Sequence, residues 1–372
     1  MHLQKLFLIN FKNYSGADIN FCNKFNCFVG NNGEGKTNLL DAIHYLSFCK
    51  SFFNPVDSQN ILNDAPFFVI QGEFSKEEKE ENIYCGLKRN ERKIFKRNQK
   101  EYDKLAEHIG LIPLVLVSPA DEELITGGSE SRRKFIDGVI SQHDKHYLEQ
   151  LIHYNKVLAQ RNSLLKSFNE NRYFDKDTLE IWDMQLIPSG EIINKKRDAF
   201  IKAFIPLFQK FHTHISGNNE TVILEYESQL NQDSFNRQLE ENLHKDRNVL
   251  YTTTGIHKDD LFFKINGFPA KKMGSQGQQK TYLLALKLAQ FEYLKKIKNT
   301  VPLLLLDDIF DKLDESRVTG LMEIVSSDDF GQIFITDTNS NRVSEILLNL
   351  QVDFKTFIIS NGAVEEKSNQ IK

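Results

Sequence analysis

The sequence predicts an α/β protein with a mixed β core and flanking helices, interrupted by a helical insertion. Apolar, strand-like runs alternate with helical patterns near both ends of the chain. A glycine-rich loop joins one of these strands to a helix, and the middle of the chain has apolar residues at three-to-four spacing. We therefore expect one discontinuous head, residues 1–118 and 218–372, and a helical insertion lobe at residues 119–217.

The composition is that of an ordinary globular protein, with 40% hydrophobic and 26% charged residues among 372. The net charge of −4 gives no overall attraction for nucleic acid. The four cysteines form no CxxC pair, which indicates reduced thiols rather than a zinc site. No apolar run reaches the ~18 residues that span a bilayer, and the start does not resemble a signal peptide. We expect a cytoplasmic protein with no membrane partner, which excludes a fused transporter.

The elements of the first part of the head are expected from short apolar runs and from one amphipathic stretch. The helix directly after the glycine-rich loop has an apolar face formed by Leu39, Leu40, Ile43 and Leu46. In chain order we expect strands at 6–10 and 26–29, a helix at 37–47, a strand at 67–74, a basic hairpin at 83–98 and a buried strand at 114–117.

The expected lobe has a helical pattern that continues to about residue 216. Its second apolar stripe is interrupted at Pro188-Ser189-Gly190, where we expect a break, and Pro206 is a second helix breaker. After the lobe, Asn266-Gly267 is a strong hairpin signal. The remaining elements are expected as strands at 222–226 and 261–265, a long helix at about 278–297, and strands at 303–306 and 332–336.

The loop at residues 30–37 matches the phosphate-binding pattern GxxxxGK[ST] in full. Glycines at these positions let backbone N–H groups turn inward toward phosphates, and the following helix adds the positive end of its dipole. Lys36 would reach the β- and γ-phosphates of ATP, and the Thr37 hydroxyl would bind Mg²⁺. The predicted ATP-binding residues are Gly30, Asn31, Asn32, Gly33, Glu34, Gly35, Lys36 and Thr37.

The apolar strand at 303–306 ends in two carboxylates, Asp307 and Asp308. Such a pair after a buried strand is a weak signal by itself, but it is strong when a phosphate-binding loop lies upstream. Successive side chains of a strand point to opposite sides, so only one of the two can sit squarely at the metal. We assign Mg²⁺ to Asp307, and we assign Asp308 as the catalytic base that orients the attacking water.

The segment Ser275, Gln276, Gly277 and Gln278 opens the last long helix, shortly before the aspartate pair. Its Ser-x-Gly-Gln core resembles the signature motif of ABC-type ATPases, and a plain helix N-cap at Ser275 is the alternative. The resemblance implies an ABC-type P-loop ATPase head in which this segment contacts ATP bound to a second protomer. Asp311 and Asp314 stand where this superfamily has its D-loop.

Further motifs make the resemblance more specific. Asn10–Tyr14, Arg132–Asp137, Gln160–Asn162, Thr254–Leu261 and the Ser275 segment follow one another as in the RecF family of bacterial recombination-repair ATPases, over nearly the whole chain. The chain departs from the family at Ile256, Lys258 and Lys280, where proline, arginine and arginine are usual. The histidine that often follows the next strand is replaced by Thr336-Asp337-Thr338.

This resemblance implies an ATP-dependent homodimer that binds double-stranded DNA beside single-strand gaps. It implies RecR and RecO as partners in loading RecA, with roles in DNA repair, replication-fork maintenance and the SOS response. Aspartate at 308, one methylene shorter than the superfamily's usual glutamate, suggests a slow, DNA-stimulated ATPase that acts as a switch.

The sequence allows three other interpretations of the class of protein. A short repair ATPase similar to SMC proteins or Rad50 shares the head motifs, but the insertion is short for a coiled coil. A head fused to a nuclease domain has only 58 residues available after Asp314. A metabolic P-loop kinase would lack the Ser275–Gln278 segment.

Two charged clusters allow both a structural and a functional interpretation. Residues 88–104 carry a net charge of +5, and Lys93, Lys96 and Arg97 are candidate DNA contacts, with a solvated hairpin as the alternative. Arg132 and Arg133 could contact DNA or nucleotide, but pairing with carboxylates such as Asp137 is favoured. His257, Asp259 and Asp260 could be a metal cluster, although a structural role is preferred because no fourth ligand is evident.

Overall fold

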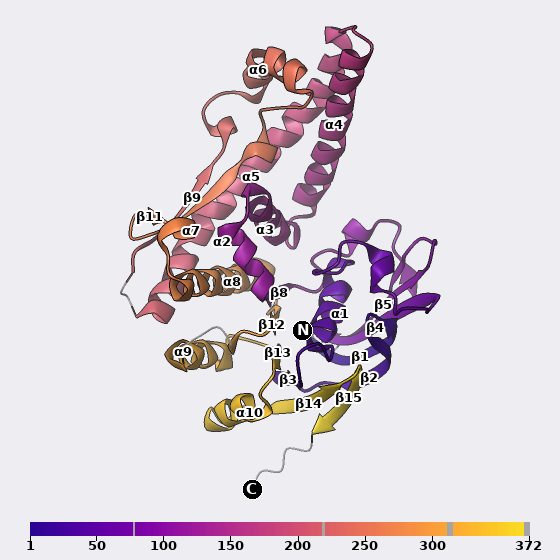
Figure 1. The fold of residues 1–372 in the computed structure, drawn as a ribbon, viewed down its shortest axis with the longest axis vertical. Helices are drawn as coiled ribbons and strands as arrows, with labels where there is room; N and C mark the ends of the chain where they lie inside the picture. The colour runs from indigo at the N-terminus through magenta and orange to yellow at the C-terminus, as the bar shows by residue number, and fades with distance from the viewer. Residues whose placement is uncertain (77–78, 218–219, 311–314, 368–372) are drawn as a thin grey trace. The chain divides into compact units, whose positions relative to one another are not determined.

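The computed structural model describes residues 1–76, 79–217, 220–310 and 315–367 (Figure 1). By their contacts the residues form two compact units. The head unit comprises Met1–Asp121, Phe211–Asn218 and Gln276–Lys372. The lobe unit comprises Glu122–Lys210 and Asn219–Ser275. The fold class predicted from the sequence, a mixed α/β head with a helical lobe, is confirmed.

A mixed sheet forms the centre of the head unit, with strand order β15-β14-β3-β13-β12-β8. All neighbours pair in parallel except β14 and β15. The inner strands β3, β12 and β13 are buried at every residue, because both faces of a parallel sheet are covered. The strands are β3 (Phe25–Val29), β8 (Leu114–Val117), β12 (Leu303–Leu306), β13 (Ile333–Asp337), β14 (Phe354–Ser360) and β15 (Ala363–Lys367).

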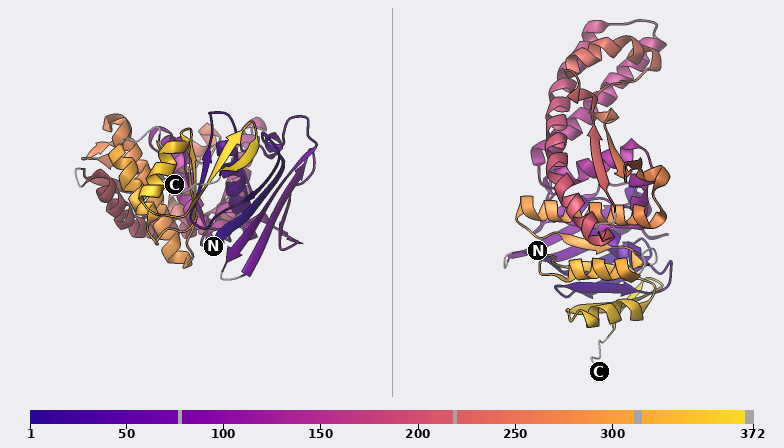
Figure 2. Two further views of the ribbon diagram at one scale, coloured as in Figure 1. Left: turned by 90° about the horizontal axis from the view of Figure 1, so that it is seen from below. Right: turned by 90° about the vertical axis from the view of Figure 1, so that its left-hand side faces the viewer.

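A second sheet of the head unit is antiparallel, with order β2-β1-β4-β5-β6-β7 (Figure 2, left). The expected basic hairpin is the pair β5 and β6. The strands are β1 (His2–Phe11), β2 (Tyr14–Asn20), β4 (Phe67–Lys76), β5 (Lys79–Lys88), β6 (Ile94–Arg97) and β7 (Lys100–Glu101).

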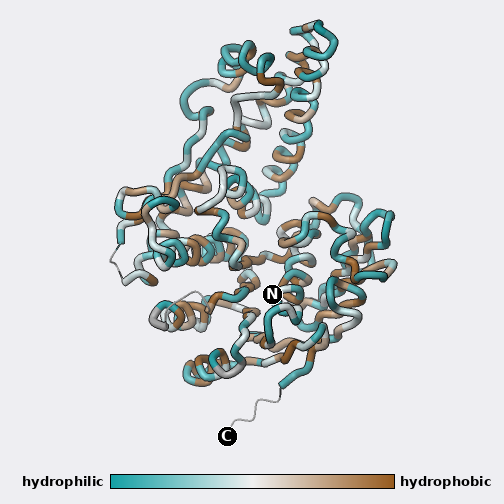
Figure 3. Tube along the Cα trace, in the orientation of Figure 1, coloured by the Kyte–Doolittle hydropathy of each residue, from teal (hydrophilic) through white to brown (hydrophobic). Residues whose placement is uncertain are grey.

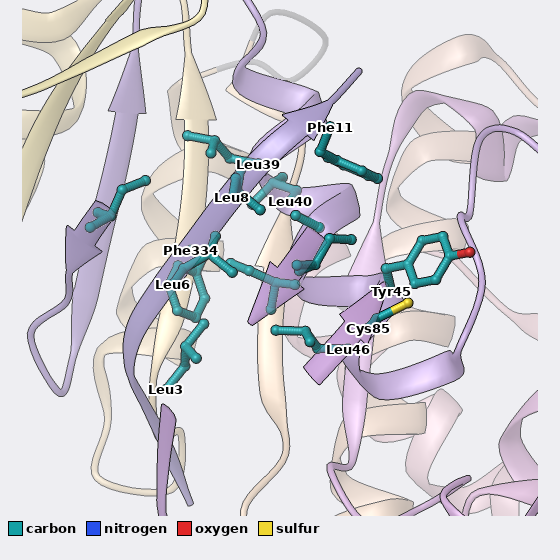
Figure 4. Close-up of a cluster of buried hydrophobic side chains, with 14 of the residues drawn as sticks. Leu3, Leu6, Leu8, Phe11, Leu39, Leu40, Tyr45, Leu46, Cys85 and Phe334 are labelled. Atoms are coloured by element: carbon teal, nitrogen blue, oxygen red, sulfur yellow. The ribbon is translucent and has the colours of Figure 1, made fainter. Parts of the chain in front are cut away.

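Helix α1 (Lys36–Phe48) lies in the core between these two sheets (Figure 4). Leu39, Leu40 and Leu46 of α1 pack with Leu6 of β1 and Phe334 of β13, and all five are fully buried. Burying a side chain of this size contributes about 1.5–3 kcal/mol. The head is completed by α8 (Gln276–Lys298), α9 (Glu315–Ser326), α10 (Ser340–Asn349) and the short 3₁₀ helices η1 (Asp57–Asn60), η2 (Leu105–Glu107) and η3 (Pro119–Glu122).

The lobe unit combines long helices with a small three-stranded sheet of order β11-β10-β9. Hydrophobic residues recur between hydrophilic ones along its helices, as the spacing predicts (Figure 3). Its elements are α2 (Glu123–Thr126), α3 (Ser129–Ser141), α4 (Lys145–Glu170), α5 (Lys176–Ser216), β9 (Val222–Glu227), η4 (Gln229–Asn231), α6 (Phe235–Val249), η5 (Ile256–Lys258), β10 (Asp260–Ile265), β11 (Phe268–Pro269) and α7 (Ala270–Met273). The residues of α5 from Phe211 onward belong to the head unit.

The second boundary expected for the lobe differs from the compact unit in the structure. We expected the lobe to end at residue 217, but the lobe unit resumes after the head-unit segment Phe211–Asn218 and continues through Ser275. The cause is pairing within the lobe: β9 pairs with β10 over its full length. Arg132 of α3 then holds Asp260 at the start of β10.

The break expected at Pro188 is wrong. Helix α5 is continuous from Lys176 to Ser216 and contains both Pro188 and Pro206. An interior proline costs a helix about 3 kcal/mol, so packing must offset this cost. Gly190 allows part of this packing, because a Cβ there would come within 2.6 Å of the Phe235 ring of α6. The missing side chain lets α5 approach α6 closely.

Among the described residues, no helix is long and apolar enough to cross a membrane.

Candidate nucleotide-binding site

The glycine-rich loop leaves the central strand β3 and ends where α1 begins at Lys36. Gly33 and Gly35 have φ angles of 84° and 115°, a region that favours glycine. At Gly35 the neighbours also require glycine, because a Cβ would lie 2.4 Å from Nδ2 of Asn13. The loop therefore keeps its shape only with these glycines.

The turn from β1 into β2 supports the glycine-rich loop through hydrogen bonds. Asn13 Nδ2 donates a hydrogen bond to the Glu34 carbonyl (2.8 Å), and Tyr14 Oη donates to the Gly35 carbonyl (2.9 Å). Asn38 of α1 donates to Asn13 Oδ1 (2.7 Å). In the sequence, Asn13 and Tyr14 stand out only as part of the family motif Asn10–Tyr14. Their supporting role has no local signal, since the loop lies some twenty residues further along the chain.

The start of α1 is suited to an anion. Its N-cap, Gly35, makes no side-chain capping bond, and the first amides of a helix have no intrahelical acceptor. Together with the helix dipole, these N–H groups form a phosphate-binding end.

Lys36 lies over the loop and is 7% exposed. Its Nζ donates to the carbonyls of Gly30 (2.7 Å) and Asn31 (2.8 Å). Burial lowers the pKa of Lys36, while Asp308, Asp307 and Asp337 act in the opposite direction. A cation held by two loop carbonyls can exchange them for phosphate oxygens with little movement.

Asp307 follows β12 and faces the first turn of α1. Its carboxylate accepts hydrogen bonds from Oγ1 of Thr37 (2.9 Å) and from Oγ1 of Thr336 (2.8 Å). The side chain is almost fully buried, and this burial raises the pKa of Asp307 against the effect of the two hydroxyls. Thr336 lies on the neighbouring strand β13, and its contact with Asp307 depends on strand pairing that the sequence alone does not indicate.

Asp308 does not continue the strand. Its φ of 49° is left-handed, and its N–H donates to Thr336 Oγ1 (2.9 Å). The expectation that Asp307 and Asp308 point to opposite sides by strand alternation therefore does not apply, because alternation requires extended backbone at both residues. Asp308 is nevertheless close enough to Lys36 to be the largest electrostatic influence on that ammonium.

The oxygen atoms at this site fit Mg²⁺. A hydroxyl and a carboxylate, from Thr37 and Asp307, already lie side by side. Mg²⁺ in nucleotide sites takes one or two such oxygens from the protein and the remainder from phosphates and water. The described residues contain no group of three or more His, Cys, Asp or Glu able to hold a metal. The Thr37 and Asp307 oxygens thus suit a metal whose other ligands come from phosphate and water.

The signature segment lies at the boundary of the two units, with Ser275 the last residue of the lobe unit and Gln276 the first of α8. At Gly277 a Cβ would lie 2.5 Å from Nη1 of Arg317, so the glycine leaves room for α9. The predicted D-loop residues Asp311 and Asp314 lie outside the described residues. The role of the segment in a second protomer stays a prediction.

The helix that begins at the signature segment is tied to the strand beside Asp307. Lys287 Nζ of α8 lies 2.6 Å from Asp121 Oδ1 and donates to the Leu116 carbonyl (2.9 Å). The next carbonyl of that strand, at Val117, accepts from the Asp307 N–H (2.8 Å). Both Lys287 and Asp121 are buried. The sequence signal for this contact is a lysine inside the apolar run LLALKLAQ.

Asp337, at the end of β13, forms an ion pair with Arg342 of α10. Arg342 Nη2 donates to Asp337 Oδ1 (2.6 Å) and its Nε donates to Oδ2 (3.0 Å). The Asp337 carbonyl also accepts from the Gly30 N–H (3.3 Å). This ion pair therefore connects α10 to the edge of the loop.

Comparisons with known proteins agree with this arrangement. A family model described as "RecF/RecN/SMC N terminal domain" matches residues 2–360. The "DNA replication and repair protein RecF" of Phocaeicola vulgatus is 53% identical over 369 residues, covering 99% of each chain. The protein of that name from Flavobacterium johnsoniae is 54% identical over 96% of this chain and 99% of its own. The chain belongs to the RecF family.

Solved structures support the same assignment. "Structure of the recombination mediator protein RecF-ATP in RecFOR pathway" matches with a TM-score of 0.89 and 33% identity, over 99% of this chain and 98% of that chain. An Smc head domain from Pyrococcus furiosus matches with a TM-score of 0.58 at 19% identity, which shows the fold alone. As a member of the RecF family, the chain is a DNA replication and repair protein.

Two of the three predicted DNA contacts of this RecF-family chain are engaged with protein. Lys93 Nζ lies 2.7 Å from Asp57 Oδ2 and also donates to the Cys49 carbonyl (2.6 Å). Arg97 forms a bidentate ion pair with Glu81. Lys96 lies over the Tyr84 ring, 5.7 Å from its centroid. The positive charge of residues 88–104 is partly neutralised by carboxylates outside that segment, so Lys93 and Arg97 are poor candidates for DNA contact.

The other charged residues singled out in the sequence hold the lobe together. Arg132 pairs with Asp260 (2.7 and 2.9 Å), and Arg133 donates to the Asp259 carbonyl (2.8 Å). His257 Nε2 donates to the Thr252 carbonyl (3.0 Å) while Nδ1 accepts from Tyr154 Oη (2.8 Å). The favoured structural reading of these residues is supported, although Asp137 pairs with Arg197 instead.

Proposed function

We propose that this chain is an ATP-switched DNA-binding protein of recombinational repair, which dimerises around bound ATP. The observation that carries the proposal is the contact between Thr37 and Asp307, 270 residues apart in sequence. It joins the phosphate-binding loop and the carboxylate strand into one polar site. The ATP-bound RecF structure similar to this chain supports the choice of nucleotide.

Within one protomer, the chain's own groups would divide the work as follows. The loop amides and Lys36 bind and orient the phosphates. Thr37 and Asp307 hold Mg²⁺, which neutralises charge on the phosphates when bound. Asp308 orients water as the general base, with its backbone fixed by Thr336. Aspartate is shorter than glutamate, so we expect slow hydrolysis.

Ser275, Gln276, Gly277 and Gln278 would complete the site of a second copy. This division explains why motifs for one reaction lie so far apart along the chain. By similarity to the RecFOR pathway structures, the proposed partners are double-stranded DNA next to single-strand gaps, together with RecR, RecO and RecA.

The test is the molecular mass of the full chain by light scattering, with and without Mg²⁺-ATP and a gapped duplex. Wild type should become a dimer with ATP. Lys36→Ala should lose ATP binding, by about a hundredfold, because charge-assisted hydrogen bonds to phosphate are lost. Ser275→Arg should bind ATP and stay monomeric. Lys202→Ala, an exposed cation of α5, is the control and should dimerise.

Hydrolysis distinguishes the two aspartates. Asp308→Asn should bind ATP and DNA and accumulate as the dimer, because the base is gone while the metal ligand remains. A wild-type hydrolysis rate in Asp308→Asn would remove this residue as the base. A dimer of Ser275→Arg as tight as wild type would overturn the composite site.

A further inference from the structure

A pocket of about 360 Å³ lies at the tip of the lobe unit, far along the chain from the nucleotide site. It is formed by the last turns of α4, the loop that leads into α5, and α6. These elements lie together at the top of Figure 1. Its lining is Leu165, Phe168, Asn169, Arg172, Tyr173, Phe174, His244, Arg247 and Asn248.

The pocket is cationic. Arg172 and Arg247 line it, and the lining includes no aspartate or glutamate. Both arginines are exposed, and neither forms an ion pair within the described parts of the chain. This contrasts with Arg161 and Arg197 of the same unit, which are fully buried against carboxylates. Two guanidinium groups without a carboxylate partner favour an anionic ligand.

The pocket also offers flat surfaces. The Arg247 guanidinium stacks on the Phe174 ring, 3.9 Å from its centroid. Phe168 meets both Tyr173 and Phe174 edge-on, at 80° and 76°. Tyr173 is 63% exposed, so its ring is accessible to a ligand. A ring and a stacked guanidinium are the surfaces on which nucleic-acid bases stack.

The loop holds these groups in place. The Tyr173 N–H donates to the Phe168 carbonyl (3.1 Å), which closes the end of α4. Arg172 has a φ of 51°, a conformation usually taken by glycine or asparagine after a helix. Below them, Leu165 is buried and anchors the turn. Backbone hydrogen bonds thus fix the main chain of Arg172 and Tyr173 before a ligand binds.

We propose that this pocket binds an unpaired nucleotide of single-stranded DNA. The base stacks on Tyr173 and on the Arg247 guanidinium, and the phosphate lies against Arg172 and Arg247. Asn169 and Asn248 supply both donors and acceptors, which suits the edge of a base better than the carboxylates of an acidic peptide. The proposal rests on the DNA-binding role proposed above and assigns single strands to the lobe unit.

The experiment measures binding of a fluorescent oligo-dT of about ten nucleotides to the full chain by anisotropy, without ATP and over a range of salt. Tyr173→Ala should weaken binding about tenfold and leave the salt slope unchanged, because stacking is lost but no charge. Arg172→Ala and Arg247→Ala should each lower the slope of log affinity against log salt by about 0.7. Arg237→Ala removes a cation from α6 outside the pocket and should change neither quantity.

The outcomes separate this proposal from the proposed function. Tip variants should keep ATP-dependent dimerisation and duplex binding, which then test the proposed function alone. Oligo-dT affinity unchanged in Tyr173→Ala and in both arginine variants would overturn the pocket as a single-strand site. An equal loss in Arg237→Ala would also overturn it, since the effect would then be general charge. Binding of a Glu-rich, Phe-containing peptide that these three variants lose, with oligo-dT unaffected, would assign the pocket to a protein partner.

Discussion

A buried charge of the lobe and two buried charges of the head are held by different kinds of partner. In the lobe, Arg197 is buried against two carboxylates, those of Asp137 and Asp259. In the head, Lys36 and Asp307 are almost as buried, yet Lys36 is bonded to carbonyls and Asp307 to hydroxyls. Charges that neutralise each other stabilise a particular arrangement of helices. Charges that are hydrogen-bonded only to neutral groups can still attract an oppositely charged ligand.

Lys287 and Asp121 sharpen this contrast, because they lie in the head and follow the lobe's pattern. They pair directly at 2.6 Å, away from the loop. The difference therefore follows the role of each charge and not the unit that contains it.

The largest effect is expected from Arg197→Met. Removing one partner of a buried ion pair leaves the others uncompensated, at a cost of about 3–5 kcal/mol. Trp182, the one tryptophan of the chain, lies in the lobe unit and reports its unfolding in urea. Lys202→Met on the same helix, where the ion pair with Asp198 is exposed, should change stability by less than about 0.5 kcal/mol. Equal losses in the two variants would contradict the structural role of Arg197.

A smaller effect, confined to acid, is expected at His257. Burial lowers the pKa of His257 to about 4, below its value of about 6.5 in an unfolded chain. Between these values the unfolded state binds the proton and the folded state does not, so stability falls as pH falls from 6.5 to 4. The loss at pH 4 should be roughly 3 kcal/mol.

The measurement for His257 is the urea midpoint of Trp182 fluorescence at several pH values. His257→Gln cannot titrate, and its midpoint should vary less across this window than that of wild type. Parallel pH profiles of the two proteins would show that His257 is not buried in its neutral form.

The smallest effect is expected in the head, at Asp307, where the substitution should raise the stability of the protein and not lower it. The pKa of Asp307 is raised by burial, so ionised Asp307 destabilises the ligand-free head above the unfolded pKa of about 3.9. Asp307→Asn should make the ligand-free head more stable at pH 7, and this gain should shrink as pH falls toward 4. Hydrogen exchange of the β12 amides measures it. The same variant should weaken Mg²⁺-ATP binding. If Asp307→Asn were less stable than wild type at pH 7, the Asp307 carboxylate would serve the fold and not a ligand.

What the sequence predicted well was local. The loop at 30–37 and the carboxylates after 303–306 are patterns of adjacent residues, and their strands and helix formed where expected. Gly190 was misread as part of a break because its partner, Phe235, lies 45 residues away and α6 was not foreseen. Lys93 was misread as a surface charge because Asp57 is 36 residues distant. Interactions of this kind depend on the tertiary fold and leave no trace in spacing.

The strand order of the central sheet has a consequence for synthesis of the chain. The strand that carries the phosphate-binding loop, β3, ends at Val29, but its neighbours β13 and β14 begin at Ile333 and Phe354. At about 5–20 residues per second, a ribosome needs roughly 15–60 s to make the intervening chain. The Gly362 N–H, which donates to the Glu34 carbonyl, emerges later still. A nascent chain thus carries the complete loop sequence without its sheet, and competence to hold a nucleotide is delayed until residues 333–362 have been made.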